Sequence, residues 1–233
     1  MLYLSYADTV RLDIRMTDVV PAIEEAFRRV GNGQAVVAPR LRVVHPPLEK
    51  SSMGKGRPWV RDLRVWSPTP AHRRECVEYL QGRLGAGIKV RAVENSEAAI
   101  RGAEIVTTAT KSLEPVMQGE WLSPGCTVLC NTPEEVDQET FLRAKIVTTY
   151  SDGILSHVPP YHALVELVEA GKLSEQDFST ELGDIVAGKV PGRSSDNEII
   201  VGLNPAFGIL DAATADFVYR RAKQMGIGTE LEA

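Results

Sequence analysis

The residue types best suited to ligand chemistry stand where a strand-like run gives way to a helix-like run. The stretch RDLRVWSPTPAH, residues 61–72, changes character at Ser67-Pro68-Thr69-Pro70. In a nucleotide-binding α/β sheet, small polar residues at such a junction are typical of the site that reads an adenosine ribose. Ser67 and Thr69 are therefore candidate cofactor-binding residues.

A glycine-rich phosphate loop should accompany such a junction, roughly 20 residues before it. The sequence at that place is APRLRVVHPPLEKSSMGKGRP. Gly54-Lys55-Gly56 lacks both a preceding strand and the GKS or GKT ending of a P-loop, and Gly85-Ala86-Gly87 precedes a strand instead of opening a helix. Because a bound phosphate needs the N–H groups of a helix start, neither stretch supplies the expected loop.

Two threonines occupy the end of a second strand-like run. Thr108 and Thr110 close the run EIVTTAT. Open α/β sheets bind ligands outside the carboxyl ends of their strands, which makes both threonines candidates for cofactor contact. The alternative is that β-branched residues simply suit a strand.

The histidines and cysteines show no spacing that is typical of a metal site or a redox pair. They are His45, His72, His157 and His162, and Cys76, Cys126 and Cys130. There is no HExxH motif, no CxxC motif and an odd number of cysteines, so we predict no bound metal and three structural thiols.

Composition narrows the class of protein. The chain has 233 residues, of which 43% are hydrophobic, and a net charge of −5. Nucleic-acid binding needs clustered Lys and Arg, so a nucleic-acid partner is not expected. No signal peptide and no run of about 18 apolar residues is present, so we expect no membrane association and a cytoplasmic location.

From residue 61 onward, strand-like and helix-like runs alternate, which is typical of a parallel sheet. The strand-like runs are LRVW, IKVRAV, EIVTTAT, CTVLCN and KIVTTY. Before them, MTDVVPAIEEAFRRVGNG predicts a helix with Thr17 as cap, and AVVAPRLRVVHPP reads as extended chain. After them, YHALVELVEAGKLSEQDF and NPAFGILDAATADFVYRRAKQMG each predict a helix. The fold class is α/β, with a Rossmann-like parallel sheet.

Several stretches, in the same order along the chain, resemble the ornithine cyclodeaminase/mu-crystallin family. They are RVWSPTP, EAAIRGAEIVTTATKSLEPVMQGEWLSPG, ELGDIVAGKVPGRSSDNEIIV and FVYRRAKQMGIGTEL. The resemblance implies an NAD(P)-binding Rossmann domain at 61–202. It also implies a small α+β substrate and dimerisation domain, to which 1–60 and the helix in 203–233 contribute.

The resemblance also implies that an internal segment is missing. Family members place a catalytic lysine and the first Rossmann strand, with its glycine-rich turn and helix, between segments similar to PRLRVVHPP and RVWSPTP. The join would lie between Arg61 and Val65, where RDLR could belong to the N-terminal domain. We therefore expect an incomplete sheet whose first strand-helix unit is absent, exposed edges on the neighbouring strands, and weakened binding of NAD or NADP.

Further site residues follow from the resemblance, each with a structural alternative. Arg40 resembles an arginine that grips a substrate carboxylate, or it is a solvent-facing strand residue. Asn204 and Gly208 resemble the turn near the nicotinamide, or they simply begin a helix. Around Ser67 no acidic residue is present, which slightly favours NADP over NAD.

Asn131, in CNTPEEVD, resembles the position where ornithine cyclodeaminases carry an acidic residue that handles protons. An amide cannot accept a proton as a general base, so ornithine cyclisation is not favoured. Asp137, nearby in sequence, is predicted to cap a helix.

Two functional hypotheses remain open. The first is an NAD(P)-dependent enzyme acting at the α-carbon of an amino-acid-like small molecule, by cyclodeamination or by imine reduction. The second is a non-catalytic derivative that binds a partner or a small ligand. In either case we predict a homodimer formed by apolar residues of the first and last long helices, namely Ile23, Phe27, Val30, Phe207, Leu210 and Phe217.

Overall fold

The structure is a computed structural model that describes residues 2–35, 60–84, 87–110, 112–151, 154, 161–203 and 208–232. The strands are β1 (Leu2–Tyr3), β2 (Asp62–Val65), β3 (Lys89–Ala92), β4 (Ile105–Thr108), β5 (Thr127–Cys130), β6 (Ala144–Thr148), β7 (Ile199–Leu203) and β8 (Thr229–Glu230). The α-helices are α1 (Tyr6–Arg11), α2 (Met16–Gly31), α3 (Pro70–Leu84), α4 (Ser96–Ile100), α5 (Gln138–Leu142), α7 (His162–Glu169), α8 (Leu182–Val186) and α9 (Gly208–Met225). The 3-10 helices are η1 (Gly119–Trp121), η2 (Pro133–Glu135) and η3 (Glu175–Phe178).

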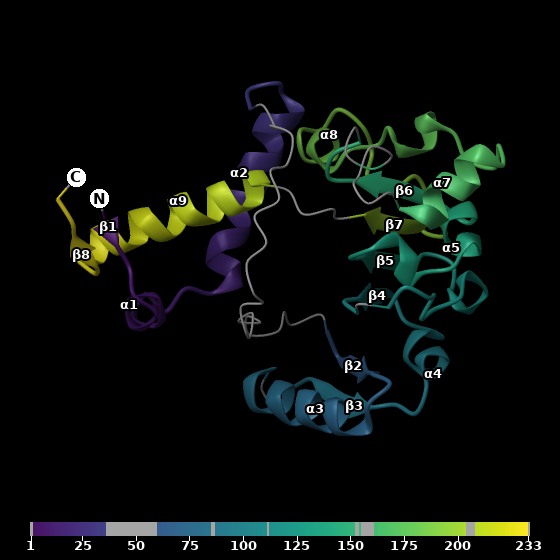
Figure 1. Cartoon of the computed structure of the whole chain (residues 1–233), viewed down its shortest axis with the longest axis horizontal. Coiled ribbons are helices and arrows are strands. Elements are labelled where there is room, and N and C mark those ends of the chain that lie inside the picture. Colours follow the sequence, from purple (N-terminus) through teal and green to yellow (C-terminus); the bar gives the residue numbers. More distant parts are fainter. Residues whose placement is uncertain are drawn as a thin grey trace.

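The main sheet has four parallel strands in the order β4-β5-β7-β6 (Figure 1). Alternate residues of β5 and β7, such as Val128 and Val201, are fully buried, and they join one apolar core with Phe141 of α5 and Leu164 of α7. The other face of the sheet is less covered, because Ile105 and Leu129 are both about half exposed. The predicted α/β class with a parallel sheet is confirmed.

The parallel pair β2–β3 forms a separate two-stranded sheet, carried below β4 in Figure 1. Within the described residues, β2 pairs with β3 alone and β4 pairs with β5 alone, so each keeps one edge without a strand partner. Arg64 links the two parts, since its Nη1 donates to the carbonyl oxygens of Ala98 at 3.1 Å and Arg101 at 2.7 Å. The described strands β2 to β7 thus form two separate parallel sheets, whereas the loss of a first strand-helix unit stays a prediction.

Some predicted boundaries need correction. The helix α2 begins at Met16 with Arg15 as its N-cap, so Thr17 lies inside the helix and does not cap it. Residues 62–65 form the single strand β2, so the predicted join between Arg61 and Val65 would lie within one strand. The strand β7 was not predicted, because the glycine-containing stretch IIVGL reads ambiguously without its neighbours. Asp137 caps α5 as predicted, accepting from the Thr140 N–H at 3.0 Å.

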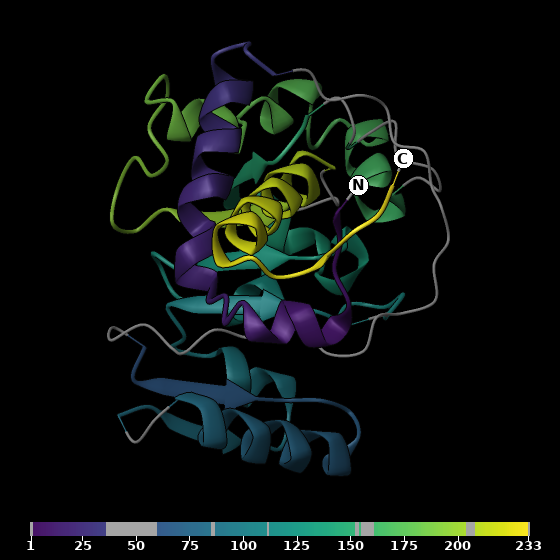
Figure 2. The same cartoon turned by 90° about the vertical axis from the view of Figure 1, so that its left-hand side faces the viewer.

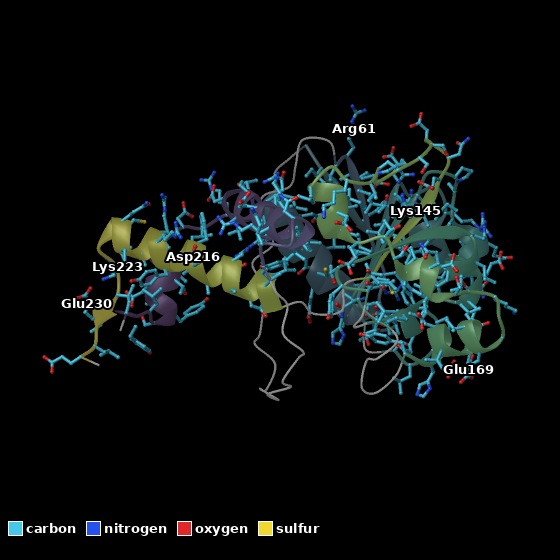
Figure 3. The ribbon with its side chains drawn as sticks, turned by 90° about the horizontal axis from the view of Figure 1, so that it is seen from above. Arg61, Lys145, Glu169, Asp216, Lys223 and Glu230 are labelled. Carbon is cyan, nitrogen blue, oxygen red and sulfur yellow. The ribbon has the colours of Figure 1, made fainter. Side chains whose placement is uncertain are left out.

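The first and last segments of the chain lie together. The helices α2 and α9 cross in front of the main sheet (Figure 2), and β1 pairs antiparallel with β8. At that end of the molecule, Lys223 of α9 forms an ion pair with Glu230 of β8 (Figure 3). The two segments therefore form one packed unit, as expected, whereas the exact division into domains stays a prediction.

Phe27 does not lie where the predicted dimer surface requires it. Its side chain is only 5% exposed, in the helix α2 that packs against both α8 and α9. Ile23 and Val30 are half-buried on the same helix, as are Leu210 and Phe217 on α9. Because Phe27 is buried within the described chain, the prediction that it contacts a second chain is wrong. Phe207 lies outside the described residues.

The helices of the described residues include none that is both long enough and apolar enough to cross a membrane.

Candidate functional site

The ends of three strands line up at one edge of the main sheet. Thr108 pairs with Cys130, and Cys130 pairs with Leu203, so these last residues of β4, β5 and β7 lie in one row. The segments that follow β4 and β5 therefore leave the sheet side by side. This carboxyl-terminal edge, defined by Thr108, Cys130 and Leu203, is where open parallel sheets bind ligands.

Glu135 joins two of these segments. Its Oε2 accepts from the Thr108 hydroxyl at 2.8 Å and from the Thr132 N–H at 3.1 Å. Its Oε1 accepts from the Thr110 hydroxyl at 2.7 Å and also from the Thr110 N–H. The carboxylate thus binds four donors, from the segment after β4 and from the segment after β5.

The environment of Glu135 keeps it ionised although its side chain is fully buried. Burial by itself would raise the pKa of this carboxyl. The hydrogen bonds from Thr110, Thr108 and the Thr132 N–H outweigh burial and lower the pKa below its ordinary value. Glu135 is therefore a fixed negative charge beside the carboxyl-terminal edge.

The contact with Glu135 occupies the donors of both predicted threonines. Thr108 and Thr110 lie at the expected edge, but Thr108 is buried and the hydroxyls of both donate to Glu135. The Thr110 oxygen also accepts from the Ser112 N–H at 3.2 Å. Direct contact of either residue with a cofactor stays a prediction, and the contact would use the remaining acceptor capacity of the oxygen.

Sequence reasoning did not single out Glu135. A signal was available, because Thr132-Pro133-Glu134-Glu135 matches the S/T-x-x-E pattern of a capping box. The structure forms that box at η2. The pattern predicts the local contact between Glu135 and Thr132, but it carries no information about Thr108 and Thr110.

Ser67 and Thr69 follow the carboxyl end of β2, where the sequence predicts them. Thr69 is exposed, directly before Pro70 opens α3, and its carbonyl accepts from the Arg73 N–H at 3.2 Å. Ser67 is partly buried. Neither residue is paired across the sheet with the main carboxyl-terminal edge, because β2 belongs to the separate pair of strands.

The remaining predicted site residues divide into two groups. Asn131 is exposed and comes directly after β5, and Gly208 is the exposed first residue of α9, soon after β7 ends. Asn131 therefore lies beside the carboxyl-terminal edge. Arg40 and Asn204 lie outside the described residues. The functions of all four residues stay predictions.

A second carboxylate holds the segment after β6. Glu181 Oε1 accepts from the Ser151 N–H at 2.8 Å and from the Ser151 hydroxyl at 2.6 Å. Thr148, the last residue of β6, bridges to Glu181 and pairs with Leu203 in the row of strand ends. The carboxyl-terminal edge is therefore braced at both sides by buried or half-buried carboxylates.

The cysteines are protected from chemistry by burial. Burial raises the pKa of the Cys126 thiol to about 11 and that of the Cys130 thiol to about 12. Cys76, on α3, is partly buried, and burial also raises its pKa. Because the thiolate is the reactive form, all three behave as structural thiols at neutral pH.

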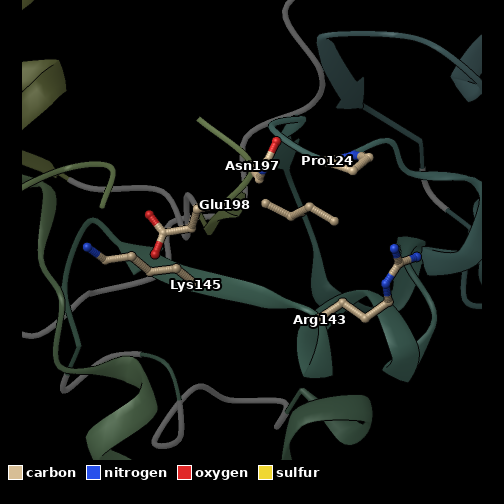
Figure 4. A pocket seen from close by; sticks show the side chains of 6 residues that line it. Pro124, Arg143, Lys145, Asn197 and Glu198 are labelled. Carbon is tan, nitrogen blue, oxygen red and sulfur yellow. The ribbon is translucent and has the colours of Figure 1, made fainter. Parts of the chain in front are cut away.

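A hollow of about 660 Å³ lies at the opposite edge of the sheet (Figure 4). Its lining residues stand at or next to the amino-terminal ends of β5, β6 and β7, and they are Pro124, Arg143, Lys145, Asn197, Glu198 and Ile199. Lys145 already donates to the Pro191 carbonyl at 2.9 Å, and Arg143 to the Gly119 carbonyl. The hollow lies at the amino-terminal edge of the sheet, and its Lys145 and Arg143 side chains already donate to backbone carbonyls. Both observations argue against this hollow as the ligand site.

Among the residues that the structure describes, no group of three His, Cys, Asp or Glu side chains could hold a metal ion. His45 and His157 lie outside that part of the chain.

Curated relatives of this chain include amino-acid oxidoreductases. The N-((2S)-2-amino-2-carboxyethyl)-L-glutamate dehydrogenase of Staphylococcus aureus is 35% identical over 141 residues, which cover 60% of this chain and 41% of the relative. The Delta(1)-pyrroline-2-carboxylate reductase of Bacillus cereus is 27% identical over 182 residues, which cover 74% and 54%. The chain spans about half the length of the curated relatives it matches.

Solved structures share the fold. The Thermococcus litoralis Delta(1)-pyrroline-2-carboxylate reductase, in complex with NADH and L-proline, superposes with a TM-score of 0.84 at 20% identity over 99% of this chain and 100% of that one. An archaeal alanine dehydrogenase dimer with bound NAD superposes with a TM-score of 0.79 at 19% identity over 100% and 99%. At these identities the likeness establishes the Rossmann-like α/β fold.

The sequence profile of one family matches residues 50–226, which is most of the chain and includes the strands and helices that build the carboxyl-terminal edge. The matched region contains the stretches that resemble this family in the sequence. The chain belongs to the ornithine cyclodeaminase/mu-crystallin family.

Proposed function

We propose that this chain binds a nicotinamide dinucleotide at the carboxyl-terminal edge of its sheet and acts as an oxidoreductase on an imine derived from an amino acid. The observation that carries the proposal is the row of strand ends, Thr108, Cys130 and Leu203, at the carboxyl-terminal edge of the sheet. Relatives named as reductases and dehydrogenases of amino-acid-like compounds support it.

The residues present suit the adenosine ribose of such a cofactor better than its pyrophosphate. Ser67 and Thr69, at the end of β2, offer hydroxyls where a ribose is read. The described residues include no glycine-rich turn that leads from a strand into a helix, so the binding of the pyrophosphate has no described counterpart. We therefore expect weaker nucleotide binding than a complete Rossmann domain would give.

Imine reduction suits this chain better than cyclodeamination. In imine reduction, the imine carbon would accept a hydride from a bound reduced nicotinamide and the nitrogen would accept a proton from water, which gives an amine. Asn131, exposed after β5, stands where the family resemblance places the acid of the lyase reaction, and an amide cannot take up a proton there. The oxidoreductase chemistry places no such demand on that position.

A direct binding experiment tests the proposal. NADH and NADPH are titrated into the purified chain and followed by nicotinamide fluorescence and by the shift in unfolding temperature, and turnover is then assayed with Δ1-pyrroline-2-carboxylate. We expect saturable binding of a reduced nucleotide. Absence of any binding at millimolar nucleotide would reject the oxidoreductase proposal.

A second candidate is a non-catalytic derivative of the family. Two observations favour it, namely the strand edges of β2 and β4 that have no partner within the described residues, and the use of the Thr108 and Thr110 hydroxyls by Glu135. Folded protein that binds neither nucleotide would support this candidate. Turnover of any imine would reject it.

Cofactor preference provides a sharper test of the ribose site. With Ser67 and no acidic residue after β2, we propose a slight preference for NADP over NAD. In Ser67→Asp, the carboxylate would accept from the ribose hydroxyls of NAD and repel the 2′-phosphate of NADP. We expect the ratio of the two dissociation constants to move toward NAD by about tenfold, as for one good polar contact.

The matched control for this change is Ser195→Asp. Ser195 is exposed in the segment before β7, at the amino-terminal side of the main sheet. It receives the same added charge away from the ribose site, so the ratio of the two dissociation constants should stay at the wild-type value. An equal shift in both variants would show that net charge, and not contact at Ser67, changes the preference.

We also propose that the chain forms a homodimer. A solved structure with the same fold is a dimer. In this chain, exposed apolar residues occur on β1, α1, the last part of α9 and the segment after β8, and they are Tyr3, Tyr6, Val10, Tyr219, Met225 and Leu231. Figure 1 shows these elements together at the end of the molecule away from the main sheet. This terminal apolar surface replaces the buried Phe27 as the proposed contact.

A further inference from the structure

The segment after β4 is held at two separate places. Its later part is tied by the backbone, since the Val116 N–H donates to the Glu135 carbonyl at 2.9 Å and Met117 bridges to Val136. Its earlier part is tied by a side chain, because Thr108 and Thr110 donate to the Glu135 carboxylate. One residue therefore holds the later part through its main chain and the earlier part through its charge.

We propose that Glu135 is a positioning residue, whose carboxylate holds the segment Thr108–Thr110 in the conformation that the carboxyl-terminal edge needs to accept its ligand. The inference rests on the proposed function for the nature of that ligand, a nicotinamide nucleotide. The contact itself spans 25 to 27 residues of sequence.

The donors around Glu135 require a carboxylate. Each oxygen accepts one backbone N–H and one hydroxyl, from Thr132 and Thr108 at Oε2 and from Thr110 alone at Oε1. A glutamine would place its NH₂ group against one of the two N–H groups in either orientation of the amide. Because neither N–H can turn away without moving the backbone, glutamine cannot replace glutamate here.

A positioning role and a general structural role predict different behaviour along the segment. A residue that only stabilised the fold would raise amide exchange throughout the sheet when changed. Loss of the carboxylate should instead free Thr110 and leave Val116 protected, because the Val116 bond goes to the main-chain carbonyl of residue 135, which every substitution keeps.

The experiment compares Glu135→Gln with Glu139→Gln, a matched change at an exposed glutamate of the neighbouring helix α5. Amide exchange is measured by NMR at Thr110, Thr132 and Val116. In Glu135→Gln we expect exchange to rise about tenfold at Thr110 or at Thr132, at whichever N–H faces the NH₂ group of the new amide, the effect of one lost hydrogen bond, with Val116 unchanged. No rise at either Thr110 or Thr132, or an equal rise at Val116, would overturn the proposal.

Thr110→Val keeps the test decisive if Glu135→Gln does not fold. It removes one hydroxyl donor from the carboxylate and preserves the shape of the side chain, so residue 110 keeps only its backbone N–H bond to Glu135, and exchange at that N–H should rise by less than in Glu135→Gln. Unchanged exchange at Thr110 in this variant would also overturn the proposal.

Nucleotide affinity then separates positioning from local order. In Glu135→Gln and in Thr110→Val we expect the dissociation constant of the reduced nucleotide to rise several-fold. Faster exchange with unchanged affinity would reject the positioning role. If the wild-type chain binds no nucleotide, the proposed function fails, and the exchange data alone decide whether Glu135 orders the segment.

Discussion

Glu135 is a buried residue whose charge is maintained by hydrogen bonds. Burial opposes ionisation, but the donors from Thr110, Thr108 and Thr132 lower its pKa below the ordinary value of 4.5. A group with a lowered pKa in the folded state stabilises the protein above its unfolded pKa, and that contribution is lost as pH falls through the folded pKa. Its contribution should therefore be complete at neutral pH.

This linkage predicts a pH-dependent cost for Glu135→Gln. At pH 7 the substitution should lower the free energy of unfolding by about 1–3 kcal/mol, because an N–H group loses its acceptor. The cost should shrink as the pH is lowered below about 4.5, since the wild-type carboxyl becomes protonated as the pH falls through its lowered pKa, and one of its oxygens then carries a proton in place of an accepted hydrogen bond. Urea unfolding of both proteins across this range measures the difference, and a cost that stays constant down to about pH 3 would contradict the prediction.

At the scale of elements, a contact between two glycines sets how closely α2 and α8 pack. A Cβ atom on Gly31 would lie 2.3 Å from the carbonyl oxygen of Gly183, and the helices could not keep their present distance. Lys189 also donates to the Gly31 carbonyl at this crossing. The crossing joins the first segment of the chain to the segment between β6 and β7.

Gly31→Ala should therefore destabilise the protein by about 1–3 kcal/mol, the usual cost of inserting a group into a packed interface. The control is Gly82→Ala on α3, where a new Cβ would meet nothing within 4 Å. That change should be neutral or stabilise by up to about 1 kcal/mol, because alanine favours a helix over glycine. Thermal unfolding of the two variants checks the contrast, and equal effects would show that the crossing is not tight.

The free edge of β4 is a second feature at this scale. Within the described residues β4 has one strand partner, β5, and its first residue Ile105 is 46% exposed. Exposed strand edges promote pairing with other chains, and a lysine on the edge opposes it.

Ile105→Lys should therefore reduce concentration-dependent aggregation while changing the free energy of unfolding by no more than about 0.5 kcal/mol. Val106→Lys, one residue along the strand, provides the contrast, because Val106 is buried in the core and a charge there should unfold the chain. Light scattering and urea unfolding measure the two effects. A large loss of stability in Ile105→Lys would show that this edge is covered in the protein.

At the scale of the whole molecule, the described chain buries the apolar residue Phe27 of α2 but leaves the terminal apolar surface exposed to solvent. Tyr6 is 85% exposed on α1 and Val10 is 60% exposed on the same helix. Apolar surface of this kind is typical of an interface between protein chains.

If this surface forms the proposed homodimer, Tyr6→Glu should shift the protein to the monomer and leave its secondary structure unchanged. The control is Leu113→Glu, which changes an apolar residue of equal exposure, 85%, in the segment after β4. Multi-angle light scattering gives the mass and circular dichroism the fold. A wild-type chain that stays monomeric at micromolar concentration would reject the dimer. A change at Phe27 cannot test it, because Phe27 is buried and a charged side chain there should unfold the chain.

What the sequence determined is local. Near-continuous apolar runs identified the parallel strands β2 to β6 but not β7. The Asp-containing turn before α5 identified its cap, and the small polar residues after β2 identified a candidate ribose site. The absence of a glycine-rich turn about 20 residues before Ser67 was also visible in the sequence, whereas the expectation of an incomplete sheet came from the family resemblance. These features depend on neighbours within one or two turns of chain, so the order of residues is sufficient to predict them.

The tertiary structure alone decided which distant residues meet. Glu135 reaches Thr108 and Thr110 only because β4 and β5 pair in a register that brings their ends together, and no periodicity encodes that register. Phe27 carries the same apolar pattern whether it faces another chain or its own helices, and only the packing of α2 against α8 and α9 buries it. A hydrophobic stripe in the sequence predicts that one face of a helix is buried, whereas the tertiary structure determines which elements cover that face.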